Sequence, residues 1–321
     1  MAMASKRILF SLVPIACAAL MGACKPGVGQ PAYLVTDYAL LAVRGEPPEA
    51  KPGANVTYEF LLASPGGTVT SADAEWEICQ TPKPPSESNA VASACTGAPD
   101  AGAASFGQTL AAPVPTKACQ LFGPIAPPPV AGQPAVRPRD PDGTGGYYLP
   151  VHVWLPGLAG GAVSGFALER ITCNLANAPS DAIADYNNRY QANLDPVIAG
   201  TDLIDANGSR LSLDGGTQSV SAGAAITIEA TFGAGSAETF PVFNQASQRL
   251  EDQQESLSMS WFVTAGSFEH DRTGVVAGDT ATATDNRWTA PNQPGTAYLW
   301  IVLRDSRGGT AFKSYQVEVV P

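Results

Sequence analysis

The sequence is poor in charged residues, in histidine and in the motifs of common metal and hydrolase sites. Only 15% of its 321 residues are Asp, Glu, Lys or Arg, and the two histidines are His152 and His270. It contains no Cys-x-x-Cys pair and no Gly-x-Ser-x-Gly pentapeptide. These absences argue against a zinc-ribbon site and against a serine hydrolase of the usual kind.

The charge that is present is acidic, with a formal net value of −11. Such a chain repels the phosphates of nucleic acids and of anionic lipids. We therefore expect no nucleic-acid partner and no electrostatic attachment to a membrane. A content of 45% hydrophobic residues together with 32 Gly and 28 Pro indicates short strands separated by many turns.

Neither histidine stands in a catalytic context. His152 lies between Val151 and Val153, so it faces the opposite, more solvated side of an expected strand, and His270 lies in a polar turn. We interpret both as plain surface histidines and assign no catalytic residue. A carboxylate-dependent, carbohydrate-active hydrolase remains an alternative function, because sequence spacing does not reveal a pair of Asp or Glu side chains that faces one cleft.

The N-terminal segment predicts export. Lys6 and Arg7 precede an uncharged, mostly apolar run over residues 8–20, and small residues end it directly before Cys24. This is a secretory signal peptide, shorter than the roughly 20 apolar residues of a membrane-spanning helix. The signal peptide can be cut directly before Cys24. The alternative is an ordinary signal peptide cut near Ala16 or Ala23, which would leave a soluble protein.

Residues 20–24, Leu-Met-Gly-Ala-Cys, resemble the lipobox of bacterial lipoproteins. That resemblance implies a diacylglyceryl group on the sulfur of Cys24, cleavage before it, and an acyl chain such as palmitate on the new amine. Cys17 is a weaker rival, because Pro14 stands where a lipobox has a branched aliphatic residue. Since Lys25 rather than Asp follows Cys24, the resemblance implies a lipid anchor in the cell envelope, at the outer membrane.

Four cysteines remain beyond the signal: Cys79, Cys95, Cys119 and Cys173. An even number in an exported chain favours two disulfides, for which three connectivities exist. Zinc is the alternative, which the scarcity of histidine disfavours. Cys79 and Cys95 bracket a Pro/Ser-rich loop, so we pair them, and this leaves Cys119 with Cys173.

The chain contains an internal repeat. Residues 53–59 and 223–229 both open on glycine and continue with period-two alternation, which places each apolar set on one sheet face. A tryptophan strand, a glycine-led strand of aromatic and aliphatic residues and a closing strand follow in each half, at 74–79, 146–155 and 166–173, and at 257–263, 295–303 and 312–320. This order predicts a duplicated sandwich-like unit.

The second unit resembles the immunoglobulin-like and PKD-like modules of bacterial surface proteins. The resemblance covers residues 195–321 and is carried by Ser260-Trp261-Phe262, residues 264–268, residues 288–291 and residues 302–309. In such modules the first tryptophan is in the core, and an Asp-x-x-Gly-Gly turn joins the last two strands. The first half departs from the pattern by a proline-heavy insertion at 113–138. The whole chain resembles two-domain lipoproteins of large-genome soil bacteria, which implies no activity.

The expected fold is all-β: two tandem immunoglobulin-like β-sandwiches with a short inter-domain helix. The expected boundaries are a lipoprotein signal peptide at 1–23, a tether at 24–30, an immunoglobulin-like domain at 31–178, a helical linker at 179–194 and an immunoglobulin/PKD-like domain at 195–321. The helix is predicted over residues 180–191, with Ser180 as its cap.

Two sets of residues are candidates for binding. Asp140 and Asp142, in the turn before Gly143, are the oxygen ligands that calcium prefers, although a plain turn into the strand of Tyr147 is the favoured explanation; we expect no other cofactor. The second set is the aromatic residues of the glycine-led strands, which would serve either a binding face or the core and domain junction: Tyr147, Tyr148, Trp154, Tyr298 and Trp300. The expected role is non-catalytic binding of an envelope protein or glycan, with a rigid spacer in an envelope assembly as a further alternative.

Overall fold

The computed structural model describes residues 29–84, 87–99, 105–124, 131, 143–158 and 160–321. It divides into two compact units, Met1–Pro31 and Ala32–Pro321. The expected signal peptide and Cys24 lie outside the described residues. Within the described part of the chain, no helix is long and apolar enough to cross a membrane.

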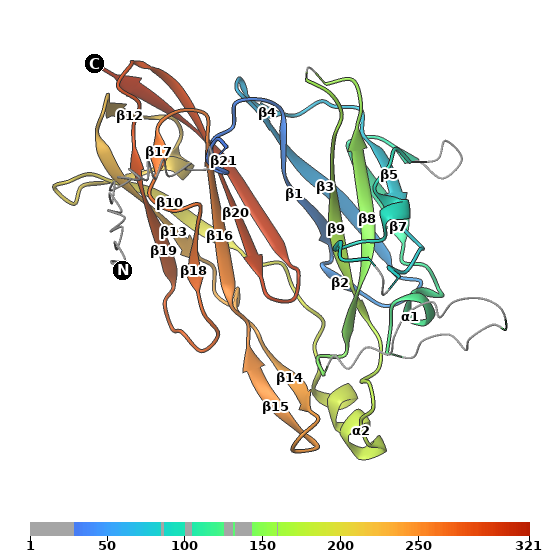
Figure 1. Ribbon diagram of the computed structural model, residues 1–321. Coiled ribbons are helices and arrows are strands. Elements are labelled where there is room, and N and C mark those ends of the chain that lie inside the picture. Colours follow the sequence, from blue (N-terminus) through green and yellow to red (C-terminus); the bar gives the residue numbers. More distant parts are fainter. Residues whose placement is uncertain (1–28, 85–86, 100–104, 125–130, 132–142, 159) are drawn as a thin grey trace, which may run out of the picture. The chain divides into compact units, whose positions relative to one another are not determined.

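The first half of the unit Ala32–Pro321 is a sandwich of two sheets (Figure 1). One sheet contains β1 (Ala39–Glu46), β3 (Asn55–Ser64), β4 (Gly67–Val69) and β7 (Thr109–Pro113). The other has the strand order β2 (Glu49–Ala50), β9 (Val163–Thr172), β8 (Gly146–Leu155), β5 (Glu75–Ile78) and β6 (Ser105–Phe106). A 3-10 turn, Ser93–Cys95, and the short helix α1 (Ala118–Leu121) lie in its loops.

The second half is also a sandwich. One sheet has the order β11 (Arg210–Ser212), β10 (Ile198–Ile204), β13 (Ala225–Phe232), β19 (Ala283–Thr289) and β17 (Ser267–Phe268). The other has the order β12 (Gln218–Ser221), β21 (Thr310–Val320), β20 (Gly295–Asp305), β16 (Leu257–Val263) and β18 (Arg272–Val275). A separate hairpin, β14 (Thr239–Asn244) and β15 (Arg249–Gln254), is inserted before β16, and a 3-10 turn spans Leu213–Gly215.

Strand order confirms the duplication expected from the sequence. The sheet β2-β9-β8-β5-β6 matches the sheet β12-β21-β20-β16-β18 position by position. In both sheets the short first strand runs parallel to the closing strand, while the remaining pairs are antiparallel. This is the strand arrangement of immunoglobulin-like sandwiches. The protein is therefore all-β, with two tandem immunoglobulin-like domains.

Each sandwich has a core built around a tryptophan in the same strand position. Trp76 on β5 and Trp261 on β16 are 1% and 0% exposed. Each indole N–H donates a hydrogen bond, from Trp76 to the Gly107 carbonyl at 2.9 Å and from Trp261 to Thr273 Oγ1 at 2.9 Å. The expectation that the tryptophan of residues 260–262 belongs to the core is confirmed.

The two sandwiches pack face to face, so that four sheets lie in layers. The sheet of β1 and β3 meets the sheet of β16, β20 and β21 (Figure 1), through a cluster that includes Leu41, Leu61 and Trp300. We call this contact the seam. β20 is buried without interruption from Leu299 to Leu303, because one of its faces lies in the core and the other in the seam. Strands buried on both faces have this continuous apolar pattern.

The linker helix α2 spans Ser180–Arg189, close to the predicted range. The predicted cap is wrong: Pro179 occupies the cap position, and no side chain caps the helix. Proline suits the start of a helix because the first amides have no intrahelical partner. α2 packs on β14 and β15, beside the hairpin in Figure 1.

The first residues of this unit pair with the second sandwich before β1 enters the first. The Val35 amide donates to the Val263 carbonyl at 2.9 Å, and the Val263 amide donates to the Tyr33 carbonyl at 2.8 Å. Leu34 therefore forms a parallel bridge with Val263. The chain therefore contacts the second sandwich at residues 33–35 and then continues across the seam into β1 of the first sandwich.

Two disulfides are present. They join Cys79 to Cys95, with Cα atoms 5.9 Å apart, and Cys119 to Cys173, with Cα atoms 5.8 Å apart. These are the pairs named from the sequence. The first closes a loop beside β8, and the second ties α1 to the end of β9.

Candidate functional site

The aromatic residues of the glycine-led strands serve mainly the core and the seam. Tyr147 is 2% exposed in the first core, and Trp300 is 0% exposed in the seam. An exposed binding role is therefore wrong for both. Tyr298 packs beside Trp300 and across Gly67, where a Cβ would lie 3.0 Å from the Tyr298 ring and where the φ of 114° also favours glycine. Trp154 is half-buried beside His152.

The structure corrects the interpretation of His152. Its side chain does face away from Val151 and Val153, as alternation requires, but that face is covered and His152 is 0% exposed. Its ring stacks on Phe166 at 4.5 Å, and Phe166 packs on the Cys79–Cys95 disulfide. Burial lowers the pKa of His152. His270 is exposed, with a side-chain exposed fraction of 60%, as expected.

The proposed calcium ligands Asp140 and Asp142 lie outside the described residues. Among the residues that the structure describes, no group of three or more His, Cys, Asp or Glu side chains is arranged to hold a metal ion. The calcium expectation therefore stays a prediction.

A cluster of buried charges lies where both sandwiches meet the linker, and we call it the polar junction. Its first centre is Arg170 on β9, whose side chain is 1% exposed. The guanidinium pairs with Glu49 at 3.2 Å and donates to the hydroxyls of Tyr190 and Tyr148, at 3.3 Å each. It occupies the space that a Cβ of Gly146 would need, 1.9 Å from Arg170 Cζ. This contact explains why β8 begins with glycine.

The second centre of the polar junction is Arg307, which lies between β20 and β21. Its Nε donates to Glu255 at 2.5 Å, its Nη2 to Glu238 at 2.6 Å and its Nη1 to the Gln191 carbonyl at 3.1 Å. The Tyr148 hydroxyl donates to the Arg307 carbonyl at 3.4 Å. The two sandwiches are thus linked by the Tyr148–Arg307 hydrogen bond and through Tyr190 of the linker, whose hydroxyl accepts from both Arg170 and Arg307, as well as by the apolar seam.

The turn that holds Arg307 is the Asp-x-x-Gly-Gly turn expected from the resemblance. One Asp305 carboxylate oxygen accepts hydrogen bonds from the amides of Arg307, Gly308 and Gly309, at 2.8, 2.8 and 2.9 Å. A Cβ at Gly309 would lie 2.1 Å from the other Asp305 oxygen. The turn therefore requires glycine there, and it fixes the direction of the Arg307 side chain.

Carboxyl groups outnumber guanidinium groups in and beside the polar junction, and burial raises the pKa of several of them. Burial, with the nearby Asp195 and Glu49 charges, raises the pKa of Glu169 to about 9. Burial also raises the pKa of Asp195 to about 7. The pKa of Glu255 rises to about 7, first through burial and then through Asp305. Protonation removes the cost of burying unpaired charge.

These shifts predict that the free energy of unfolding falls as pH rises from about 4 to about 9. A carboxyl whose folded-state pKa is raised stabilises fully below its unfolded value, about 4.3 for Glu, and loses that stabilisation as the pH rises through the folded value. Denaturant unfolding at pH 5, 7 and 9 measures the slope, and Glu169→Gln is expected to make it shallower. The exposed Glu269→Gln is the matched control. A slope that is unchanged in Glu169→Gln contradicts the prediction.

The buried carboxyls bear on the hydrolase alternative. An acid–base pair of a glycosidase has to reach substrate, with its carboxyl groups facing one cleft. Glu49, Glu169 and Glu255 are each at most 2% exposed. They line none of the open pockets beside Tyr33, Lys313 or Asp279. The concentration of acid at the polar junction is thus a feature of packing between domains.

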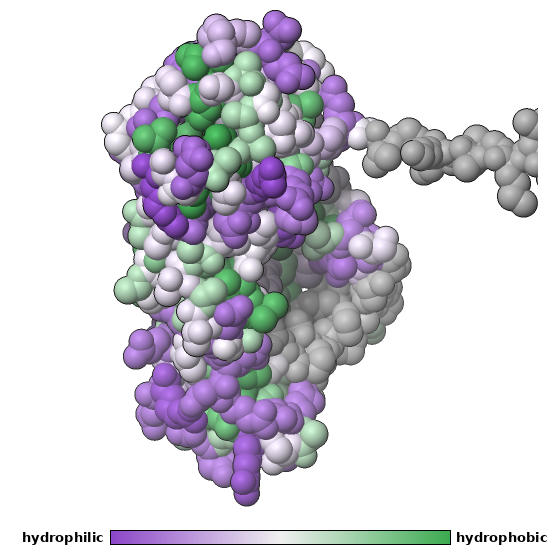
Figure 2. Space-filling view, turned by 90° about the vertical axis from the view of Figure 1, so that its left-hand side faces the viewer, coloured by the Kyte–Doolittle hydropathy of each residue, from purple (hydrophilic) through white to green (hydrophobic). Residues whose placement is uncertain are grey.

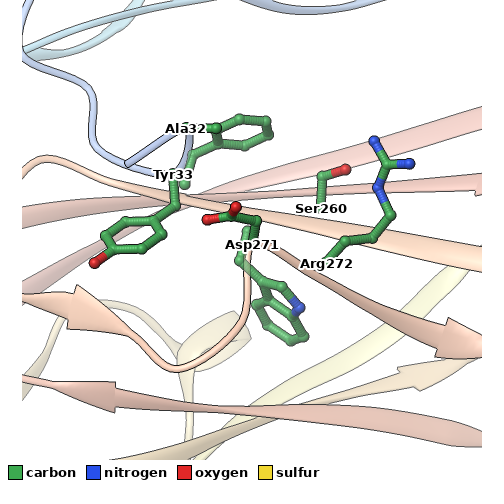
Figure 3. Close-up of a pocket in the computed structure, with 7 residues that line it drawn as sticks. Ala32, Tyr33, Ser260, Asp271 and Arg272 are labelled. Carbon is green, nitrogen blue, oxygen red and sulfur yellow. The ribbon is translucent and has the colours of Figure 1, made fainter. Parts of the chain in front are cut away.

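An open pocket of 380 Å³ lies near the chain's entry into the second sandwich. Its lining comes from the segment that pairs with Val263 and from β16 and β18: Ala32, Tyr33, Ser260, Trp261, Phe262, Asp271 and Arg272. Figure 3 shows Tyr33 and Asp271 on one side of Ser260 and Arg272 on the other. No local sequence pattern identifies this pocket, because Tyr33 and Arg272 are far apart in the chain.

Comparisons with known proteins assign no family. No family model matches the chain, and no curated protein matches it. Among solved structures, the tandem Ig repeats of Dlar are 12% identical with a TM-score of 0.23, over 89% of this chain and 99% of that one. The adhesin InvE of Yersinia pseudotuberculosis is 11% identical with a TM-score of 0.22, over 88% of this chain and 59% of that one. At these values neither likeness carries an argument about function.

Proposed function

We propose that this chain is a lipid-anchored protein of the bacterial cell envelope that holds a rigid pair of immunoglobulin-like domains for non-catalytic binding. The observation that carries the proposal is the continuous contact between the sandwiches. The apolar seam and the polar junction together fix one arrangement of the two domains. A rigid body lowers the entropic cost of binding, because the interacting surface is ordered beforehand.

Surface character is compatible with this role. Figure 2 shows hydrophilic side chains distributed over the face that it presents, with apolar ones in small groups between them. Large apolar residues are exposed singly, as at Phe106 and Val276. Single exposed apolar residues are normal on soluble domains, whereas an extended apolar patch marks an interaction site. The proposal therefore places binding in recesses and loops.

The anchor is tested at Cys24. Mass spectrometry of the N-terminal peptide from native membranes is expected to find Cys24 as the first residue, with the added mass of lipid. Cys24→Ser is expected to remove the protein from the membrane fraction, because three acyl chains are lost and one acyl chain alone binds only marginally. Cys17→Ser is the matched control and is expected to stay membrane-bound. A wild-type protein with an unmodified N-terminus in the soluble fraction contradicts the anchor.

A further inference from the structure

The pocket beside Tyr33 contains two opposite charges that do not pair. Asp271 and Arg272 are consecutive and exposed, and neither side chain makes an ion pair or hydrogen bond with the described part of the chain. Ser260, directly opposite Arg272 in the strand register, has no side-chain hydrogen bond there either. Three polar groups therefore line the same recess; Asp271 and Arg272 are exposed, and Ser260 is 6% exposed.

Exposed opposite charges pair at other places on the second sandwich, as in Arg210 with Glu229 at 2.6 Å and Lys313 with Asp214 at 2.6 Å. Arg272 instead has another cation as its charged neighbour. The pKa of Arg304 is lowered by burial and then by Arg272, and Arg304 donates to the Leu41 carbonyl at 3.0 Å. The Arg272 end of the pocket therefore favours an anionic group.

The aromatic wall of the pocket is preformed. The Tyr33 carbonyl accepts a hydrogen bond from the Val263 amide at 2.8 Å, and its ring packs edge-on against Phe268 at 5.7 Å. Tyr33 is half-buried, so part of its ring is available. It lies on the Asp271 side in Figure 3. An aromatic face beside a carboxylate suits an ammonium group and the hydrocarbon attached to it.

We propose that this pocket binds a small zwitterion of the dipeptide kind. Its carboxylate pairs with the Arg272 guanidinium and accepts from the Ser260 hydroxyl. Its ammonium group donates to Asp271, and its hydrocarbon part lies against Tyr33. The pocket volume of 380 Å³ is within the range of about 300–1,000 Å³ typical of small-molecule sites. The inference rests on the binding role proposed above and supplies its ligand class.

The test is titration of the detergent-solubilised full-length mature protein with alanylalanine and with its blocked forms. The unblocked dipeptide is expected to bind, and shifts in amide NMR signals are expected at Tyr33, Ser260 and Arg272. Acetylation of its amine or amidation of its carboxyl is expected to weaken binding by roughly tenfold or more, since each removes the ligand's charge from one charge-assisted ion pair. No binding of alanylalanine, or equal binding of the doubly blocked form, overturns the proposal. Stronger binding of the neutral disaccharide lactose also overturns it.

Two variants test which group of the ligand each charged side chain of the pocket binds. Asp271→Asn is expected to abolish the discrimination against the acetylated amine, and Arg272→Gln the discrimination against the amidated carboxyl. Both side chains are exposed, so both variants are expected to fold, which unfolding curves check. Asp285→Asn with Arg287→Gln makes the same charge changes at exposed positions on β19, in the other sheet, and is expected to bind normally. Loss of binding in this control overturns the site.

The result of the dipeptide-binding test can be distinguished from the result of the lipid-anchor test. Cys24→Ser protein is expected to bind alanylalanine as the wild type does. Binding by a protein that proves to be unlipidated retains the pocket and removes the anchor. Failure of a lipidated protein to bind removes the pocket and retains the anchor.

Discussion

Replacing Arg307 by methionine is expected to lower the free energy of unfolding by about 3–5 kcal/mol, the usual cost of removing one partner of a buried ion pair. The Arg307 side chain is 2% exposed and pairs with Glu255 and Glu238. Its removal leaves the Glu255 carboxyl buried without a cation. Methionine keeps the volume and flexibility of the side chain, so the loss reports charge rather than a cavity. Denaturant unfolding at neutral pH measures it.

Two controls make this result specific. Arg287→Met, at an exposed position on β19, is expected to change stability by no more than about 0.5 kcal/mol. Adding Glu255→Gln to Arg307→Met is expected to recover part of the loss, because the orphaned charge is gone. A single-variant cost below about 1 kcal/mol, as for an exposed ion pair, contradicts the role given to the polar junction.

Replacing Trp300 by alanine is expected to cost about 3–5 kcal/mol, as for other large core truncations. Trp300 is 0% exposed, and its indole N–H donates to Thr68 Oγ1 at 2.7 Å, across the seam. The variant leaves a cavity between the sandwiches and removes the indole hydrogen bond to Thr68. Denaturant unfolding measures the loss, and hydrogen exchange is expected to accelerate in β3 and β20.

The matched control is Trp154→Ala, because Trp154 is half-buried and lies outside the seam. It is expected to cost less and to leave exchange in β20 unchanged. If Trp300→Ala destabilises no more than Trp154→Ala, the seam does not stabilise the pair of domains in the manner described.

The sequence allowed the fold class to be predicted because period-two alternation is a local property. The repeat from residues 53–59 to 223–229 located matching strands β3 and β13, and both lie at the same position in their sheets. The seam was not predictable in this way. The run from Leu299 to Leu303 indicates a strand buried on both faces, but nothing local identifies β1 and β3 as the covering sheet.

The polar junction was missed for the same reason. Glu49 and Arg170 are separated by more than a hundred residues, and each alone reads as an ordinary surface charge. The sequence did contain one signal, the consecutive charged residues Glu169 and Arg170 inside an apolar strand. In such a strand a charged side chain is expected to reach solvent only at the strand's ends. His152 shows the complementary error: alternation gave its direction correctly, whereas burial depended on the loop closed by Cys79 and Cys95.

The pairing of Leu34 with Val263 has a consequence for a chain made from its N-terminus. Residues 33–35 are among the first of this unit to be synthesised, and their partner on β16 follows more than two hundred residues later. The outer face of β1 and β3, with Leu41, Leu61 and Ala63, likewise stays uncovered until β20 has been synthesised. A translation product that stops before β16 therefore contains every strand of the first sandwich and still exposes an apolar sheet face. Such truncated chains are expected to aggregate or be degraded even though one whole domain is present.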